Sequence, residues 1–111
     1  MKFEIKSAED RKKAYMEIRR SMIRDIVKGR IPTFHVFHID EYGVASNHYM
    51  TPISLEHVDE EGNKMIWIDD FEFFLRLLLR LRGVVEVEYD NKRPAIVFTY
   101  IEHKVESGIL R

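Results

Sequence analysis

The chain has 111 residues, of which 45% are hydrophobic and 33% are charged. This length suits one hydrophobic core, so we expect residues 1–111 to form a single domain. The hydrophobic fraction is well above that of intrinsically disordered chains, and the chain is expected to fold. The sequence contains no cysteine, which excludes disulfides, cysteine-based metal centres and thiol nucleophiles.

The sequence shows no targeting or membrane segment. The first residues, Met1–Lys6, include no apolar run followed by a cleavage site. The longest apolar stretch, near Phe73–Val85, is interrupted by Arg76, Arg80 and Arg82 and does not resemble a membrane span. We therefore expect an intracellular, cytoplasmic protein.

The composition has a bias that is typical of heat-adapted proteins. Glutamine is absent, asparagine is scarce, and residues of both charge signs are densely mixed. A thermophilic archaeal host or its virus is one interpretation, and an ordinary mesophilic source is the alternative.

The first part of the chain predicts a strand, a long helix and a β-hairpin. A short extended start, Lys2–Lys6, is followed by Ser7, a favourable N-cap. A helix is predicted over Ala8–Lys28, ended by the glycine and proline that follow it. Thr33–Asp40 and Val44–Met50 are rich in β-branched and aromatic residues and flank a glycine-containing turn, which predicts a hairpin.

The middle of the chain predicts two more strands and a second helix. Ile53–Val58 and Lys64–Ile68 flank an acidic turn and can pair in a consistent register. Asp69 and Asp70 are predicted to cap a helix over Phe71–Arg82, with acidic residues at its positive end and arginines toward its negative end.

Val84–Tyr89 and Pro94–Ile101 predict a last hairpin in which Tyr89 pairs with Pro94. Its apolar side chains would share one face, while Glu86 and Glu88 face the other way. The predicted order is β-α-β-β-β-β-α-β-β, with neighbouring strands joined by short loops. This order predicts an α+β fold in which two helices pack on an antiparallel sheet.

The first predicted helix carries a basic stripe, which comprises Lys13, Arg20, Arg24 and Lys28. At 100° per residue these cations fall within a narrow arc, on a different side from Tyr15, Ile18, Met22 and Ile26. They extend over about 20 Å of helix, which suits successive phosphates of a nucleic-acid backbone. Glu17 lies in the same arc and favours the alternative, a solvated face with local ion pairs.

Charge is also segregated along the chain. Residues 1–38 contain ten Lys and Arg against five Asp and Glu, whereas residues 39–73 contain one against nine. Such a distribution can make the molecule bipolar. The formal net charge of −1 argues against a protein that coats DNA without regard to sequence, because such proteins are strongly basic overall.

The second predicted helix is apolar around most of its circumference, with a polar strip formed by Glu72, Arg76 and Arg80. This is more apolar surface than one sheet face needs, and a second copy of the chain would cover it. We therefore predict a homodimer whose interface includes Phe73, Phe74, Leu77, Leu78 and Leu81. The alternative is that the helix is fully enclosed within its own chain.

The five histidines are the only candidates for metal binding or catalysis. If Ile39 pairs with Val44, then His35 lies opposite His48, and two imidazoles with a carboxylate can bind a divalent metal. No third ligand can be named, and the alternative is that the histidines are half-buried strand residues. The sequence has no glycine-rich phosphate loop and no serine in a nucleophile elbow, so we predict no cofactor and no catalytic residue.

Three functional hypotheses follow. The favoured one is a small nucleic-acid-binding or regulatory protein, a homodimer that contacts DNA or RNA phosphates through two copies of the basic stripe. The second is a protein-interaction or inhibitor module without nucleic-acid affinity, which uses the acidic segment Asp59–Asp70 or the sheet edge. The third is a metal-dependent enzyme that uses His35, His48 and an acidic residue.

Overall fold

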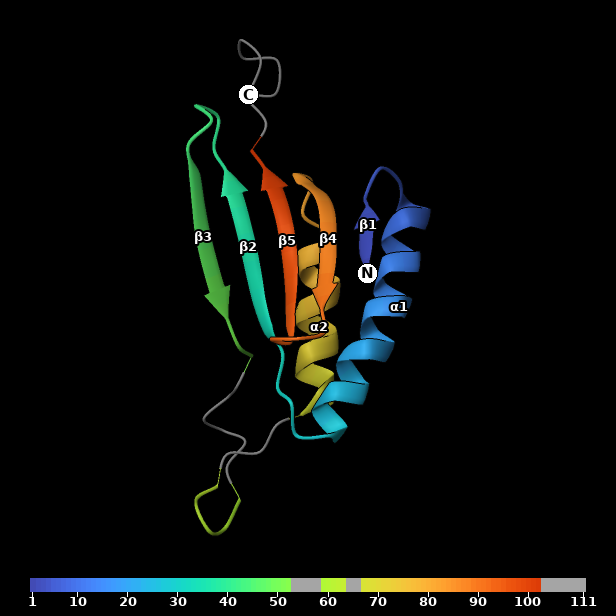
Figure 1. The fold of residues 1–111 in the computed structure, drawn as a ribbon, viewed down its shortest axis with the longest axis vertical. Helices are drawn as coiled ribbons and strands as arrows, with labels where there is room; N and C mark the ends of the chain where they lie inside the picture. Colours follow the sequence, from blue (N-terminus) through green and yellow to red (C-terminus); the bar gives the residue numbers. More distant parts are fainter. Residues whose placement is uncertain (53–58, 64–66, 103–111) are drawn as a thin grey trace.

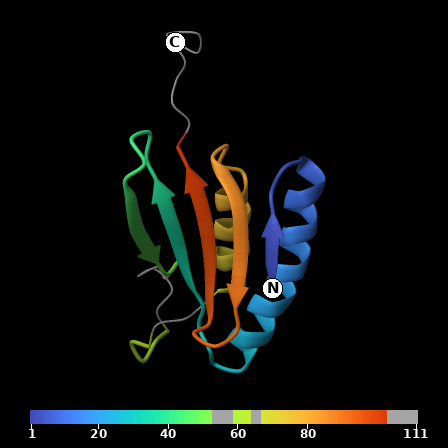
Figure 2. The same ribbon diagram turned by 45° about the horizontal axis from the view of Figure 1, so that its top comes forward.

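The computed structural model describes residues 1–52, 59–63 and 67–102, which form a sheet layer and a helix layer (Figure 1). The elements in chain order are β1 (Lys2–Glu4), α1 (Ala8–Val27), β2 (Thr33–Ile39), β3 (Ala45–Met50), α2 (Ile68–Leu79), β4 (Val84–Asp90) and β5 (Ala95–Ile101). Figure 2 shows both helices on the same side of the sheet, with α2 behind β4 and β5 and α1 alongside β1. The predicted α+β class is confirmed.

The five strands lie in the order β1-β4-β5-β2-β3. Neighbouring strands run antiparallel except β2 and β5, which run parallel and pair along their whole lengths from Thr33 and Ala95 onward. The sheet is therefore mixed, which corrects the prediction of an antiparallel sheet. The chain from β2 to β5 passes through β3, α2 and β4, and parallel neighbours require a long connection of this kind.

The second helix begins earlier than predicted. The predicted strand over residues 53–58, and most of the one over 64–68, lie outside the described residues. At the end of the latter, Trp67 is the N-cap of α2 and Ile68 is its first helical residue. Asp69 and Asp70 consequently lie in the first turn rather than at the cap, where their negative charge still complements the positive end of the helix dipole.

The first helix agrees closely with its prediction. Ser7 is the N-cap, and its hydroxyl accepts a hydrogen bond of 3.1 Å from the Asp10 amide. Lys28 is the C-cap, so the helix ends one residue earlier than predicted. Ile18 and Met22 are buried on the side predicted to be apolar. Neither of the two helices in the described part of the chain is long and apolar enough to cross a membrane.

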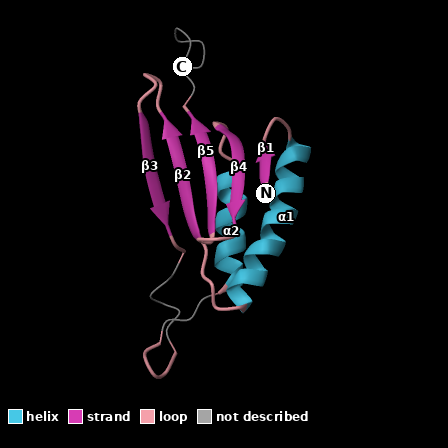
Figure 3. Cartoon of the chain, in the orientation of Figure 1, coloured by secondary structure: helices cyan, strands magenta, loops and turns pink. Residues whose placement is uncertain are grey.

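The hydrophobic core lies between the helices and one face of the sheet, and Phe34 on β2 is at its centre. The rings of Phe34 and of Phe74 from α2 pack in a T-shaped arrangement, with 5.0 Å between ring centroids. It also packs against Phe71 from α2 and Phe98 from β5, at 6.1 and 6.4 Å. Figure 3 shows the two helices together on this side of the strands. In the described residues no helix covers the other face, which we call the open face.

The last hairpin has a different register from the predicted one. Tyr89 pairs with Ile96 rather than with Pro94, and a bulge interrupts the ladder near the start of β4. Proline has no amide hydrogen to donate, so Pro94 belongs to the turn and pairing begins after it. Glu86 and Glu88 nevertheless lie on the open face, as predicted. Side chains alternate along a strand, and Val87 and Tyr89 between and beyond them point into the core.

A buried carboxylate links the end of α1 to this hairpin. Asp25 is only 4% exposed, and its carboxylate accepts a hydrogen bond from the Tyr89 hydroxyl. The same carboxylate forms an ion pair with Arg30 Nη1 at 3.1 Å. Arg30 Nη2 also donates to the carbonyl oxygens of Asn91 and Lys92, at 2.7 and 2.9 Å. Burial and the neighbouring Asp25 raise the pKa of Tyr89 above its usual value. No local sequence pattern predicts this cluster, because its members come from α1, β4 and two loops.

Tyr89→Phe should lower the free energy of unfolding by about 1–3 kcal/mol, because it removes a donor from a buried carboxylate. The exposed Tyr42→Phe is the matched control and should leave stability unchanged. Urea denaturation measures both variants. The raised pKa of Tyr89 also means that stability falls as pH rises above about 10, where the unfolded chain ionises first. The decrease in stability above about pH 10 that is due to Tyr89 should be absent from Tyr89→Phe. Equal stability of Tyr89→Phe and Tyr42→Phe would contradict the prediction.

Candidate nucleic-acid interface

The basic stripe is exposed along its whole length on α1. All four of its members are solvent-exposed. Arg20 forms an ion pair with Glu17 at 3.5 Å, which is the local pair that the alternative interpretation anticipated. Within the described residues, Lys13, Arg24 and Lys28 form no ion pair. An exposed pair contributes little stability, so Arg20 can exchange Glu17 for another anion at small cost.

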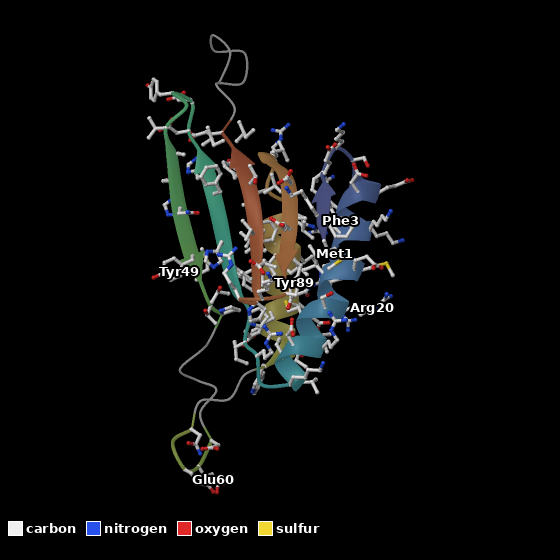
Figure 4. The ribbon with its side chains drawn as sticks, in the orientation of Figure 1. Met1, Phe3, Arg20, Tyr49, Glu60 and Tyr89 are labelled. Atoms are coloured by element: carbon white, nitrogen blue, oxygen red, sulfur yellow. The ribbon has the colours of Figure 1, made fainter. Side chains whose placement is uncertain are left out.

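The stripe lies on the side of α1 that faces away from α2. Arg19 on α1 pairs with Glu72 on α2, and the Tyr15 hydroxyl accepts a hydrogen bond of 3.1 Å from Arg76 Nη2. At 100° per residue, the centre of the stripe is about 160° around α1 from Tyr15 and Arg19. Figure 4 shows Arg20 projecting from the outer side of α1, away from the strands.

A second group of cations, which we call the basic groove, lies between α1 and α2. The groove has a volume of about 790 Å³ and is lined beside Tyr15 by Arg11, Lys12, Arg76, Arg80 and Arg82. No carboxylate contributes to its lining. The residues come from the first half of α1, from α2 and from the turn that follows α2, so helix packing brings together charges that are far apart in the sequence.

The basic groove was not predicted from the sequence. The polar strip of α2 is visible there, because the spacing of Arg76 and Arg80 places them on one side of a helix. Which element this strip faces depends on how the helices pack, and the sequence alone carries no signal for that. Nothing in the local sequence distinguishes Arg11 and Lys12 from the many other charges of α1.

The predicted dimer residues divide into two groups. Leu78 is buried, and Phe74 packs against Phe34, so both contribute to the core of their own chain. The other three are exposed, by 60% for Phe73, 47% for Leu77 and 39% for Leu81. Phe73 and Leu77 lie one turn apart on α2, and Leu81 follows just past the C-cap, Arg80; we call these three residues the apolar strip.

The structure separates the two histidines of the proposed metal site. Ile39 pairs with Ala45, so His35 lies opposite Tyr49 and His48 lies opposite Val36. Because successive strand residues alternate between faces, His35 and His48 lie on opposite faces of the sheet and cannot share a metal. Within the described residues, no three His, Asp or Glu side chains are close enough together to hold one.

The error in register comes from the turn. The Asp40 carboxylate accepts hydrogen bonds from the amides of Tyr42 and Val44, at 2.9 and 2.8 Å. The Asp40 amide donates to the Val44 carbonyl at 3.0 Å. Val44 therefore closes the turn against Asp40, and regular pairing with β2 begins one residue later.

Each described histidine has a local partner. The His35 ring stacks on Tyr49, and its Nε2 lies 2.8 Å from the Thr33 hydroxyl. His38 Nε2 lies 3.0 Å from the Glu102 carboxylate. Burial, and secondly the positive charge of Arg93, lower the pKa of His35. These contacts agree with the interpretation of the histidines as ordinary strand residues.

Comparison of the chain with protein-family models, with curated proteins and with solved structures finds no match in any of the three. Inference about function therefore depends on the side chains of this chain alone.

The pKa of His35, followed by NMR titration of its ring protons, should lie below 6.5. Arg93→Gln should raise the midpoint without restoring it fully, because burial is the larger cause. Arg82→Gln makes the same charge change elsewhere and should have no effect. Since the unfolded chain binds this proton more readily, His35 also makes stability decrease as pH falls through about 6.5. A midpoint at or above 6.5 in the unmodified protein would disprove the assignment.

Proposed function

We propose that the protein binds DNA or RNA through phosphate contacts, as a homodimer that presents two copies of the basic stripe. The observation that carries this proposal is the exposure of four cations along one side of α1. Within the described residues three of them have no ion-pair partner. They extend over about 20 Å, a length of duplex that carries roughly a dozen phosphate charges.

The distribution of charge between the two layers supports the same proposal. The stripe belongs to the helix layer, whereas Glu86 and Glu88 lie on the open face of the sheet. A polyanion would be attracted to the cations of α1 more strongly than to the open face, where Glu88 is negative and Glu86 is paired with Lys2 at 3.8 Å. A chain of near-zero net charge can bind a polyanion in this way because its charges are separated in space.

The apolar strip on α2 supports the homodimer. Burial of Phe71, Leu75 and Leu78 uses one side of this helix. The strip remains exposed as three large apolar side chains, two on α2 and one just past its C-cap, and neighbouring exposed apolar residues are typical of interaction surfaces. A second copy that covers the strip would double the number of cations available to one polyanion.

The β3 edge favours a second candidate function, a protein-interaction module. Among the described strands β3 pairs only with β2, and all six of its side chains are exposed. It contains no Lys, Arg, Asp or Glu, the residues that usually protect a sheet edge from pairing with another chain. This candidate predicts no affinity for nucleic acid.

A titration of labelled DNA and RNA at increasing salt distinguishes the two candidates. Affinity should fall linearly with the logarithm of salt concentration. Arg20→Glu with Arg24→Glu should weaken binding at least about tenfold and reduce the salt slope by about two for each protomer. Lys92→Glu with Arg93→Glu makes the same charge change on the β4–β5 turn and should have a much smaller effect. Absence of binding at low salt, or equal effects of the two variants, would reject the nucleic-acid proposal.

The oligomeric state tests the apolar strip directly. Analytical ultracentrifugation should give the unmodified protein twice the chain mass of 13.3 kDa. Phe73→Asp with Leu77→Asp should give a folded monomer, because both side chains are exposed and their loss leaves the core intact. Met16→Asp with Val27→Asp alters equally exposed apolar residues on α1 and should remain dimeric. An unmodified protein that sediments as a monomer contradicts the prediction.

A further inference from the structure

We propose that the basic groove between α1 and α2 is a binding site for a ligand with two or more closely spaced phosphate charges. Such a ligand is either a run of adjacent phosphodiesters in a nucleic-acid strand or the polyphosphate of a free nucleotide. The first source rests on the proposed function, and the second is independent of it.

The first support is the convergence of uncompensated positive charge. Five cations line the groove without a carboxylate among them. Within the described residues, Arg11, Lys12, Arg80 and Arg82 have no ion-pair partner. Gathering like charges destabilises a fold, and a bound anion removes that cost. A ligand with several negative charges matches five cations better than a single phosphodiester does.

The second support is that one guanidinium is already held in position. Arg76 donates from Nη2 to the Tyr15 hydroxyl, and its central carbon lies 5.3 Å from the centroid of the Tyr15 ring. The hydrogen bond and the cation–π contact fix the guanidinium plane and leave its other N–H groups free to donate to phosphate oxygens. Arg76 therefore loses little conformational entropy when a ligand binds.

The third support is that the nearest acidic group on α2 is neutralised. Glu72 precedes Arg76 by one helical turn and is paired with Arg19, and its side chain is only 15% exposed. This pair joins the two helices beside the groove without placing a free negative charge in it. The cations consequently face the ligand while the walls remain fixed relative to each other.

The fourth support is size. A volume of about 790 Å³ falls within the range of about 300–1,000 Å³ that is usual for sites of small ligands. The groove uses side-chain cations rather than a glycine-rich loop, so the absence of phosphate-loop motifs does not bear on it. Since it lies on the side of α1 opposite the basic stripe, its occupancy can be measured separately.

Isothermal titration calorimetry with sodium pyrophosphate tests the groove. One site per chain is expected, and Arg80→Gln with Arg82→Gln should weaken it at least about tenfold through loss of charge-assisted hydrogen bonds. Arg24→Gln with Lys28→Gln removes the same charge from the stripe and should change affinity less than twofold. Arg11→Gln with Lys12→Gln tests the opposite wall if the first variant fails to fold. No pyrophosphate binding, or equal weakening by groove and stripe variants, overturns the proposal.

Two further arms identify the source of the phosphate. If it is a nucleic-acid strand, pyrophosphate should compete with DNA, and the groove variant should weaken DNA binding. If it is a free nucleotide, ADP should bind more tightly than pyrophosphate, and the groove variant should bind DNA normally. Either result supports the site. Failure of the proposed function is distinguishable, because DNA would then not bind while pyrophosphate binding persisted.

Discussion

The packing of α2 against Phe34 is the contact on which the rest of the surface depends. Phe71 and Phe74 meet that ring, and this fixes the rotation of α2 about its own axis. With those residues turned inward, Arg76 reaches Tyr15 on α1 and Phe73 is left in solvent. One aromatic cluster therefore determines both where the basic groove forms and which apolar residues remain uncovered.

Local features of the fold could be predicted from the sequence because they depend on neighbouring residues. Ser7 begins α1 as predicted, since an N-cap acts within a single turn. Both flanking hairpins were predicted in the correct places, but their registers were not. Register depends on turn geometry, and the roles of Asp40 and Pro94 moved each ladder away from the simplest pairing.

The remainder could not be predicted because it depends on residues far apart in the chain. The parallel pairing of β2 with β5 joins segments about sixty residues apart, and no local pattern specifies it. The basic groove has the same origin, because Lys12 and Arg80 line one site only after the two helices pack together. The stripe on α1 was predicted because its residues share a single helix. Asp25 was overlooked because its burial depends on Tyr89 from another element.

The placement of cations on two flanks of α1 restricts how a long polyanion can lie on this protein. The basic stripe and the basic groove are separated by roughly half of the helix circumference. A straight, stiff duplex touching one flank runs past the other without reaching it, because its persistence length of about 150 base pairs far exceeds the width of a helix. Simultaneous occupancy of both flanks by duplex DNA thus requires two separate segments, and α1 would then act as a bridge that holds them side by side.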